Sequence, residues 1–351
     1  MKKVIFCASA LMLGAAAFAQ SNDSDVLQNG TSNVATVTQT GMDNESTVEH
    51  DGSQPFKIKR NEATIVQTGN DNYSFARSQD GEDNVITTTS VGNENDAYVK
   101  QIGSRNTSII AQDGDDNNAR STVTFSNDNE SYIYQTGNGN DARTAQRGAG
   151  SNISTVTTIG DDNVANTSQN GFGNTSTIDQ TSSLASGANN NMAKADQLGS
   201  DNTSTLIQRG DYNLAETDQE GDGNSARTRQ LSDLNDSFIT QIGDANRADV
   251  RQFGGTVNAS DILQDGNSNN SSVDQFGSDN ESTIVSTGDG NMNTVAQGNQ
   301  SPLNVRSYGS LSTINQLGDS NMTDVFQSGN MQMSTITQTG DMNSATVTQT
   351  N

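Results

Sequence analysis

The sequence holds few side chains that could carry out catalysis. His50 is the single histidine and Cys7 the single cysteine, whereas serine and aspartate occur throughout. An activated nucleophile needs a partner base, and a zinc site needs several imidazole or thiolate ligands, so neither kind of site can be assembled. His50 also stands where other segments have glutamine, which makes it a substitution within a pattern. We therefore predict that the chain is not an enzyme and that it holds no cofactor.

Short acidic segments are the remaining candidates for a metal site. Residues 81–84 and 160–163 read Gly-Glu-Asp-Asn and Gly-Asp-Asp-Asn, and Ca²⁺ prefers oxygen ligands of this kind. The spacing lacks the glycine-rich nonapeptide pattern of calcium-binding β-rolls. We interpret these residues as solvated turn acids and predict no metal site, with Ca²⁺ binding as the alternative.

Amide side chains, in contrast, recur at a fixed spacing. The pattern Gln-x-Gly-x-x-Asn-x-Ala/Ser-x-Val/Ile-x-Gln returns about every eleven residues, in 28 units between Gln28 and Gln349. Stacked Asn or Gln side chains form ladders in which each amide bonds to its copies above and below. The amides that we predict to form such ladders, together with the glycines of their units, are Gln28, Gly30, Asn33, Gln39, Gly41, Asn44, Gln101, Gly103, Asn106, Gln112, Gly114, Asn117, Gln135, Gly137, Asn140, Gln338, Gly340, Asn343 and Gln349.

The residue two positions after each asparagine reveals a longer period. It alternates between alanine and serine over much of the chain, as in Ala35, Ser46, Ala63 and Ser74. The true period is therefore about 22 residues, which makes about fourteen double units without an internal domain boundary. Register kept over most of 351 residues argues against disorder, which 30% hydrophobic residues and a net charge of −24 would otherwise favour.

The alternation of residue types within each unit predicts β-strands. Side chains on a strand alternate between its two faces, so Asn33, Ala35, Val37 and Gln39 point the same way and the residues between them point out. The Gly-x-x-Asn segment that follows is a tight reversal, because glycine and asparagine tolerate positive φ. Both flanking strands keep their patterned face inward, so each double unit is one strand-arc-strand rung.

Stacked rungs define the predicted fold. Successive rungs would lie ~4.8 Å apart and give two facing parallel sheets. In the thin core between them small residues would meet large ones, as Ala35 meets Val48 and Val37 meets Ser46. We therefore predict an all-β, amyloid-like β-solenoid of stacked strand-arc-strand rungs.

The ends and the interruptions of the repeat set the predicted domains. Residues 1–19 have two lysines, an apolar stretch and a small-x-small end, which indicates a cleaved signal peptide. Residues 20–27 would be a short N-terminal leader and residues 28–351 a single repeat solenoid. Two six-residue insertions, after Gly52 and after Gln180, and a degenerate stretch between Gln297 and Gln316 are expected in loops on one edge of the solenoid.

Charge excludes two classes of partner. A polyanion with a pI near 4.1 has no electrostatic reason to bind nucleic acid or an anionic membrane. The first apolar stretch is too short to span a bilayer, and no other follows, so we predict no membrane insertion.

The repeat resembles a known family. Residues 135–142, Gln-Thr-Gly-Asn-Gly-Asn-Asp-Ala, and the units built on Ser46, Ser108 and Ala119 are similar to the curlin repeat of bacterial curli fibres. The resemblance extends over residues 28–349. It implies an exported amyloid-fibre subunit of the biofilm matrix, with a curli nucleator and an outer-membrane secretion channel as partners. The array is longer than is usual for the family, and the usual Gln-rich leader is reduced to residues 20–27.

The pattern at the ends independently favours polymerisation. A monomeric solenoid needs atypical terminal caps, yet the repeat runs from Gln28 to Gln349. We therefore predict a secreted subunit that assembles with itself, head to tail, into extracellular fibres for biofilm and adhesion. A nucleating minor subunit or a monomeric β-solenoid adhesin is the alternative. An ice-binding solenoid is disfavoured because the outward threonines do not recur from rung to rung, and a carbohydrate-cleaving β-helix because the chain has no tryptophan.

Overall fold

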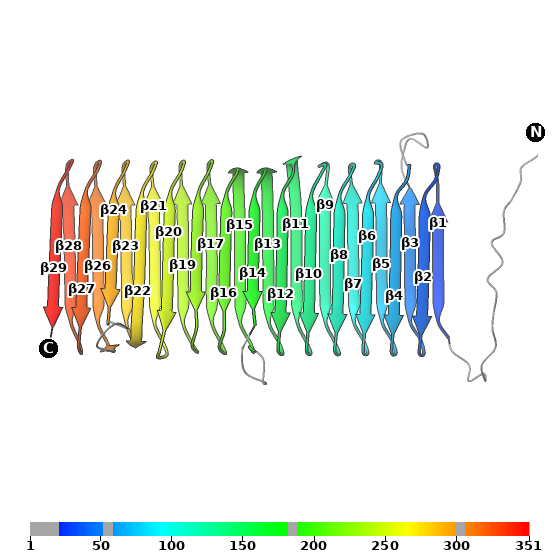
Figure 1. Cartoon of the computed structure of the whole chain (residues 1–351), viewed down its shortest axis with the longest axis horizontal. Helices are drawn as coiled ribbons and strands as arrows, with labels where there is room; N and C mark the ends of the chain where they lie inside the picture. The colour runs from blue at the N-terminus through cyan, green and yellow to red at the C-terminus, as the bar shows by residue number, and fades with distance from the viewer. Residues whose placement is uncertain (1–20, 52–58, 182–187, 299–305, 351) are drawn as a thin grey trace, which may run out of the picture.

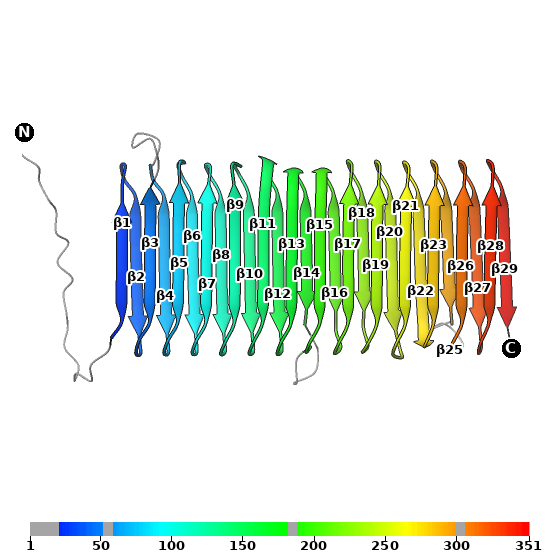
Figure 2. The same cartoon turned by 180° about the vertical axis from the view of Figure 1, so that it is seen from behind.

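The computed structural model describes residues 21–51, 59–181, 188–298 and 306–350. These residues form β-strands joined by short arcs, without a helix, and the strands lie side by side in one long, flat block (Figure 1). Figure 2 shows the same block from its other side. Within the described ranges no helix is long and apolar enough to cross a membrane.

The strands form two sheets, and successive strands along the chain alternate between them. The first sheet contains, in spatial order, β1 (Asp23–Gln28), β3 (Glu45–Asp51), β5 (Tyr73–Gln79), β7 (Asp96–Ile102), β9 (Asn118–Thr124), β11 (Asp141–Gly150), β13 (Val164–Phe172), β15 (Met192–Ser200), β17 (Leu214–Glu220), β19 (Asp236–Ile242), β21 (Ala259–Asp265), β23 (Glu281–Thr287), β26 (Leu311–Leu317) and β28 (Met333–Thr339). The second contains β2 (Val34–Thr40), β4 (Glu62–Thr68), β6 (Val85–Val91), β8 (Thr107–Asp113), β10 (Glu130–Thr136), β12 (Ile153–Ile159), β14 (Thr175–Gln180), β16 (Thr203–Gln208), β18 (Ser225–Gln230), β20 (Arg247–Phe253), β22 (Asn270–Ser278), β24 (Met292–Gln297), β27 (Met322–Ser328) and β29 (Ser344–Thr350), with β25 (Ser307–Tyr308) beside β22.

All neighbouring strands pair in parallel, and the register places like residues side by side. Ala142 of β11, for example, pairs with Ala119 on one neighbour and Ala165 on the other. Because each strand is followed by one in the opposite sheet, the chain coils once for every two strands. The predicted all-β solenoid with two facing parallel sheets is confirmed.

The core is a thin layer between the sheets. Inward residues alternate with outward ones along every strand, so that β8 is buried at each second position. Ala119, Ile133 and Ala142 are fully buried in one continuous cluster. Some small hydroxyl residues that face each other bond across the core, as Ser131 Oγ does with Thr144 Oγ1 at 2.5 Å. The core is narrow because each rung contributes only a few small apolar side chains.

Arcs at both edges reverse the chain. In the segment from Gly114 to Asn117 the glycine has φ +127° and Asp116 has φ +57°. The left-handed position is therefore the residue before the asparagine, not the asparagine as the sequence analysis expected. Side chains as different as Tyr212 and Leu234 occupy that position, also with positive φ. They are tolerated there because they project away from the stack into solvent, where both are exposed.

The repeat begins before Gln28. Residues 23–28, most of the segment expected to be a leader, form β1 and pair in register with β3, so that Ser24 lies beside Ser46 and Val26 beside Val48. Asn22 precedes β1 as an asparagine precedes most later strands, and Asn44 bonds to it. The expected signal peptide, residues 1–19, lies outside the described residues.

The expected insertions lie mainly outside the described residues, but the strands on either side of them are described. The strand register is the same before and after each interruption, since Gln39 pairs with Gln67, Gln169 with Gln197, and Gln297 with Gln327. The first insertion separates β3 from β4, and the second separates β14 from β15. Connections from first to second sheet and from second to first lie at opposite edges, so the insertions do not share one edge as expected.

Candidate functional site

Asparagines at the arcs form continuous rows along the stack. Asn140 donates its backbone N–H and its Nδ2 to Oδ1 of Asn117 on the preceding rung, at 3.2 and 2.9 Å. The same Nδ2 donates to the carbonyl oxygen of Gly160 on the following rung, at 2.8 Å. Asn163 then donates its own backbone N–H and Nδ2 to Oδ1 of Asn140. Each member of these asparagine rows therefore bonds to both neighbouring rungs.

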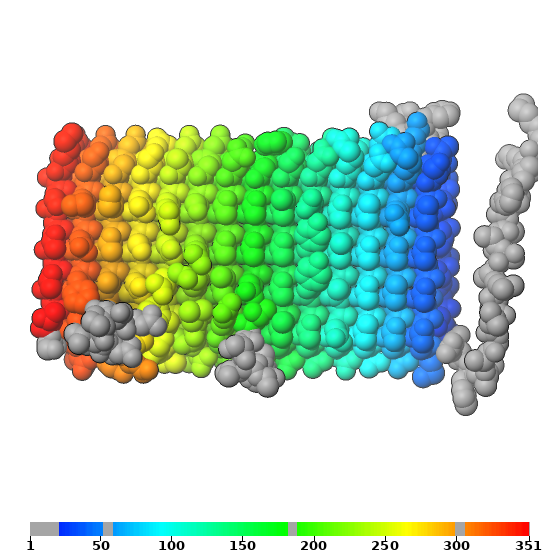
Figure 3. Space-filling model, in the orientation of Figure 1, coloured from blue at the N-terminus to red at the C-terminus, as the bar shows by residue number. Residues whose placement is uncertain are grey.

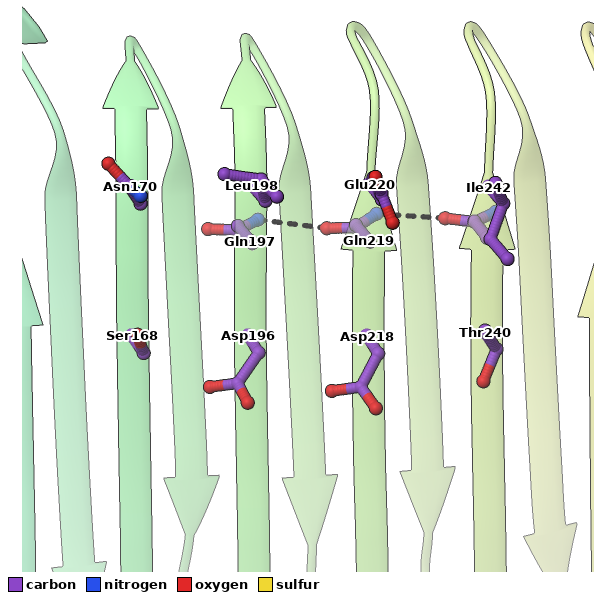
Figure 4. A pocket seen from close by; sticks show the side chains of 11 residues that line it. Ser168, Asn170, Asp196, Gln197, Leu198, Asp218, Gln219, Glu220, Thr240 and Ile242 are labelled. Atoms are coloured by element: carbon purple, nitrogen blue, oxygen red, sulfur yellow. Dashed lines mark hydrogen bonds between the residues drawn. The ribbon is translucent and has the colours of Figure 1, made fainter. Parts of the chain in front are cut away.

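Glutamines at the other end of each strand also form rows, in which the side-chain amides donate in the opposite direction along the stack. Nε2 of Gln112 donates to Oε1 of Gln135 on the following rung at 3.1 Å, and also to the backbone carbonyl of Asn117 at 2.8 Å. Figure 4 shows one such glutamine row, in which Gln197 donates to Gln219 and Gln219 to Gln241, at 2.9 and 2.8 Å. Within the rows, each asparagine amide thus donates to the preceding asparagine, toward the N-terminal end of the stack, and each glutamine amide to the following glutamine, toward the C-terminal end.

The structure places the ladder residues of the sequence analysis in these rows or in the arcs beside them. Gln28, Gln39, Gln101, Gln112, Gln135, Gln338 and Gln349 lie on β1, β2, β7, β8, β10, β28 and β29. Asn33, Asn44, Asn106, Asn117, Asn140 and Asn343 each stand directly before a strand, and Gly30, Gly41, Gly103, Gly114, Gly137 and Gly340 lie in arcs with positive φ.

Several glutamine positions hold other residues, and the consequence is visible in the hydrogen bonds. Where Ser78, Val123, Thr158 or Ser286 precedes a glutamine in the row, the Oε1 of that glutamine has no hydrogen-bond partner. These acceptors belong to Gln101, Gln146, Gln180 and Gln316. Ser90 is the exception, because its hydroxyl donates to Oε1 of Gln112 at 3.0 Å.

His50 occupies a glutamine position between Gln28 and Ser78. The side chain is fully buried, and neither ring nitrogen has a hydrogen-bond partner. Burial penalises the charged imidazolium and lowers the pKa of His50 to about 4. The imidazole is therefore neutral at physiological pH and packs as a core residue.

The arcs contain a further row that the sequence analysis did not identify. The residue after each arc glycine is often Asn or Asp, and its side-chain oxygen accepts the backbone N–H of the equivalent residue on the preceding rung. Asn138 Oδ1 accepts from Asp115, and Asp161 Oδ1 accepts from Asn138, at 2.9 and 2.8 Å. The recurring Asn or Asp after glycine was the signal for this row.

Carboxylates of the arcs therefore have a structural role. Asp161, from the acidic segment 160–163, holds the neighbouring rung as described above. Within the described ranges, no group of three or more His, Cys, Asp and Glu side chains is arranged to hold a metal ion. The repeat architecture is structural rather than catalytic.

The first and last rungs are open. In the described part of the chain, β1 and β2 pair with one neighbour each, β3 and β4, and β28 and β29 likewise pair only with β26 and β27. Inward residues that are fully buried inside the stack are uncovered at its ends, as Val26 is 51% exposed whereas its neighbour Val48 is 0% exposed. Unpaired strand edges of this kind are templates for further strands.

The outer faces of the two sheets differ. Figure 3 shows one face as straight rows of side chains that follow the stack. On the second sheet some outward threonines lie on neighbouring rungs, because only every second unit belongs to this sheet, but the row is not kept along the stack. The paired outward residues run Thr36, Thr64, Thr87, Ile109, Tyr132, Thr155, Thr177 and Thr205. Ile109 and Tyr132 interrupt the row, which leaves no continuous flat threonine surface for ice.

Comparison with protein families gives a match along the chain. Six segments match the family model described as curlin associated repeat: residues 19–52, 92–120, 199–230, 210–254, 255–288 and 312–350. Together they include more than half of the 351 residues. A search of curated proteins gives no match.

Proposed function

The chain belongs to the curlin repeat family, and from this premise we propose that it is a secreted structural subunit that polymerises head to tail into extracellular, amyloid-like fibres. The observation that carries the proposal is the pair of open rungs at the two ends of a regular stack. Each end exposes unpaired backbone groups and inward apolar side chains. A second copy would bury both and add another parallel pair of strands in each sheet.

The direction of the amide rows supports head-to-tail joining. At the C-terminal end, Asn343 offers Oδ1 as an acceptor and Gln349 offers Nε2 as a donor, as their counterparts Asn321 and Gln327 do one rung earlier. At the N-terminal end, Asn33 and Gln39 occupy the same two rows. Asn33 of an incoming copy would donate to Asn343, and Gln349 would donate to Gln39.

Head-to-head joining has no such match. Two N-terminal ends would set asparagine donors against asparagine donors and glutamine acceptors against glutamine acceptors. Each mismatched pair would leave buried polar groups without a partner, at a cost of ~1–3 kcal/mol per group. The filament would therefore be polar, with a single direction of stacking.

Export and cellular partners complete the proposal. Residues 1–19 would serve as a cleaved signal peptide, which gives a mature chain of residues 20–351. By family resemblance, an outer-membrane secretion channel would pass the chain and a curli nucleator would start growth at the cell surface, with biofilm formation and adhesion as the role of the fibre. The second candidate, a nucleating subunit or monomeric adhesin, shares the fold and differs in whether the open rungs recruit copies.

Charge would control the rate of assembly. The mature chain would carry about two net negative charges per rung, because loss of Lys2 and Lys3 takes the net charge from −24 to −26. Copies approaching end to end repel within the Debye length of ~8 Å at physiological salt. Added salt should therefore shorten the lag before growth, and a lag that does not change between low and high salt contradicts this control.

An assembly assay with end variants tests the proposal. Val26→Asp would place a charge in the buried junction, whereas Leu27→Asp on the same strand points outward; both side chains are about half exposed in the free subunit, so both variants should fold. We expect thioflavin T fluorescence and electron microscopy to show fibres for the wild type and Leu27→Asp and few for Val26→Asp. Wild-type chain that stays monomeric at high concentration overturns the proposal and favours the monomeric adhesin.

A further inference from the structure

Four arginines gather on the outer face of the second sheet. This basic patch consists of Arg227 and Arg229 on β18 and Arg247 and Arg251 on β20, all at outward positions. Asp249 is the one acidic side chain among the outward residues of the two strands. Such a concentration of cations is unusual in a chain that has 18 basic residues and 42 acidic ones.

The basic patch is poorly neutralised by its own chain. Arg229 and Arg251 stand directly beside each other on adjacent strands, an arrangement of like charges that destabilises a sheet. Arg251 pairs with Asp274 at 3.4 Å, but within the described residues Arg227, Arg229 and Arg247 form no ion pair. The buried Nε atoms of Arg229 and Arg251 have no hydrogen-bond partner. Burial and the neighbouring guanidinium groups lower the pKa of Arg229.

The opposite outer face is acidic at nearly the same rungs. A groove of about 440 Å³ lies on the first sheet. Figure 4 shows Asp196 and Asp218 side by side in it and Glu220 above them. Lys194 is shared between the two aspartates, at 2.8 and 3.5 Å. Glu216, the outward neighbour of Asp218 on β17, adds a further negative charge. We name Asp196, Glu216, Asp218 and Glu220 the acidic groove.

The two charged surfaces cannot meet within one molecule. The basic patch and the acidic groove lie on the outward sides of two sheets whose inward sides face each other, so a partner of the basic patch must come from outside. The spacing between rungs is the same on both faces. Arg229 and Arg251 are one rung apart, as are Asp196 and Asp218, so the arginines and the aspartates match rung for rung.

We propose that the basic patch on the second sheet binds the acidic groove on the first sheet of a neighbouring copy, and that this contact joins filaments side by side. The inference rests on the proposed polymerisation, because filaments repeat the contact at every subunit. Guanidinium groups would enter the groove and form bidentate pairs with its carboxylates. Leu198 and Ile242, exposed at the groove, would add apolar contact.

Repetition makes a weak contact effective. An exposed ion pair contributes only ~0–1 kcal/mol, so a single patch would hold two free subunits poorly. In a filament the same contact recurs with every subunit, and linked contacts act as one multivalent interaction. Side-by-side joining should therefore follow elongation and should be reversed by salt, since the Debye length falls to ~3 Å at 1 M.

Complementary charge reversals provide the test. One variant carries Arg227→Glu and Arg229→Glu, which makes both faces acidic; the other carries Glu216→Lys and Asp218→Lys, which makes both faces basic. A control with Lys100→Glu on β7 and Arg120→Glu on β9 changes the net charge as much as the first variant, on strands that do not border either surface. Fibre length and the fraction of filaments lying in pairs or bundles are scored separately by electron microscopy.

The expected pattern is specific. Each reversed variant alone should grow filaments of normal length that remain single, with at least ~10-fold fewer bundles than the wild type, a ratio that corresponds to ~1.4 kcal/mol. Mixing filaments of the two variants should restore bundles, because an acidic face then meets a basic one. The control should bundle like the wild type.

Three outcomes would overturn the proposal. Bundles that persist in both variants show that other surfaces join the filaments. Loss of bundles in the first variant alone indicates that the arginines bind a different anionic partner. Mixed variants that stay single show that the two surfaces do not meet. If no filaments form at all, polymerisation itself has failed. The contact is then tested by sedimentation of mixed monomeric variants against each variant alone, at low salt and high protein concentration, where a weak ion-pair contact is populated.

Discussion

The asparagine rows and the glutamine rows run through the same core, yet one is nearly unbroken and the other is not. On the second sheet every asparagine position from Asn33 to Asn343 holds asparagine, and on the first sheet the row is complete from Asn22 to Asn280. The glutamine rows contain the substitutions His50, Ser78, Ser90, Val123, Thr158 and Ser286. The difference follows from what each amide holds.

Asparagine lies at the arc and joins three rungs through both backbone and side chain. Along its row Asn140 takes part in five hydrogen bonds, to Asn117, Gly160 and Asn163, and its side chain makes four of them. Gln146, in the same rung, donates three, to the carbonyls of Glu130 and Asn152 and to Gln169. A strand tolerates the loss of its glutamine because the backbone ladder is unchanged, whereas loss of the asparagine also releases the arc.

The largest expected effect comes from adding a side chain at an arc glycine, where the next rung leaves no space for a Cβ atom. Gly137 has φ +114°, and a Cβ there would overlap the carbonyl oxygen of Gly160 on the next rung. Gly137→Ala should therefore separate two rungs and cost at least ~4 kcal/mol in strain and lost hydrogen bonds. Gly223→Ala is the matched control, because its Cβ would meet nothing within 4 Å. Equal denaturation midpoints for the two variants would contradict this account of the arc.

Removing one amide from each kind of row compares them directly. Asn140→Ala should lower the free energy of unfolding by ~3–5 kcal/mol, since it removes the side chain that makes four hydrogen bonds. Gln146→Val should cost only ~1–2 kcal/mol, because valine already occupies the neighbouring position Val123 and fills the space with apolar contact. Urea denaturation of the monomer in low salt measures both. A larger loss for Gln146→Val would reverse the ranking of the rows.

His50 makes one end of a glutamine row sensitive to pH. Its pKa of about 4 in the folded chain lies below the ordinary value of 6.5, so its neutral form stabilises the fold fully above pH 6.5. That stability is lost as the pH falls from 6.5 toward 4, to a limit of roughly 3 kcal/mol. Gln28 and Ser78, its neighbours in the row, are uncharged and cannot offset the effect.

Hydrogen exchange of β1, β3 and β5 at pH 7 and pH 4 measures this loss. The wild type should lose protection in these strands at the lower pH, and His50→Gln should lose much less. Equal losses in the two proteins would show that other groups control the pH response of this end.

The smallest expected effect is a gain from completing a row. Gln146, which follows Val123 in the row, has an unpartnered Oε1, and Gln101 precedes Val123. A glutamine at position 123 would donate to Gln146 and fill the gap, so Val123→Gln should be neutral or stabilise the fold by ~1 kcal/mol. Val156→Gln, at an inward core position without amide neighbours, should destabilise instead. Destabilisation by Val123→Gln would show that the row does not set the preference at this position.

Sequence reasoning predicted most of the fold because the signals repeat. The alternation of Asn33, Ala35, Val37 and Gln39 fixes which side chains point inward, and the 22-residue period fixes how rungs stack. One copy of this pattern would be weak evidence, but errors at single positions do not accumulate when the pattern returns along the whole chain. The same repetition made the amide rows predictable.

Other features could not be predicted because they depend on three-dimensional context. The direction in which each amide donates follows from its bond to a carbonyl of the facing strand, which spacing alone does not show. Equivalent arc positions adopt the same left-handed conformation with different residue types, as Asp116, Tyr212 and Leu234 illustrate. Thr36 and Thr64 are neighbours on the second sheet, which becomes visible only when the units are assigned alternately to the two sheets.

Cross-linking through the proposed junction tests the central claim most directly. Ser24 and Ser334 lie in the same inward row at opposite ends of the first sheet, and residues 20–351 contain no cysteine. In a head-to-tail filament they would stand on adjacent strands ~4.8 Å apart, within the range that a disulfide bridges. Oxidised filaments of the Ser24→Cys, Ser334→Cys double variant should give covalent multimers well beyond dimers, and either single variant should give none. Dimers from a single variant, or no cross-links from the double variant in intact filaments, would contradict head-to-tail assembly.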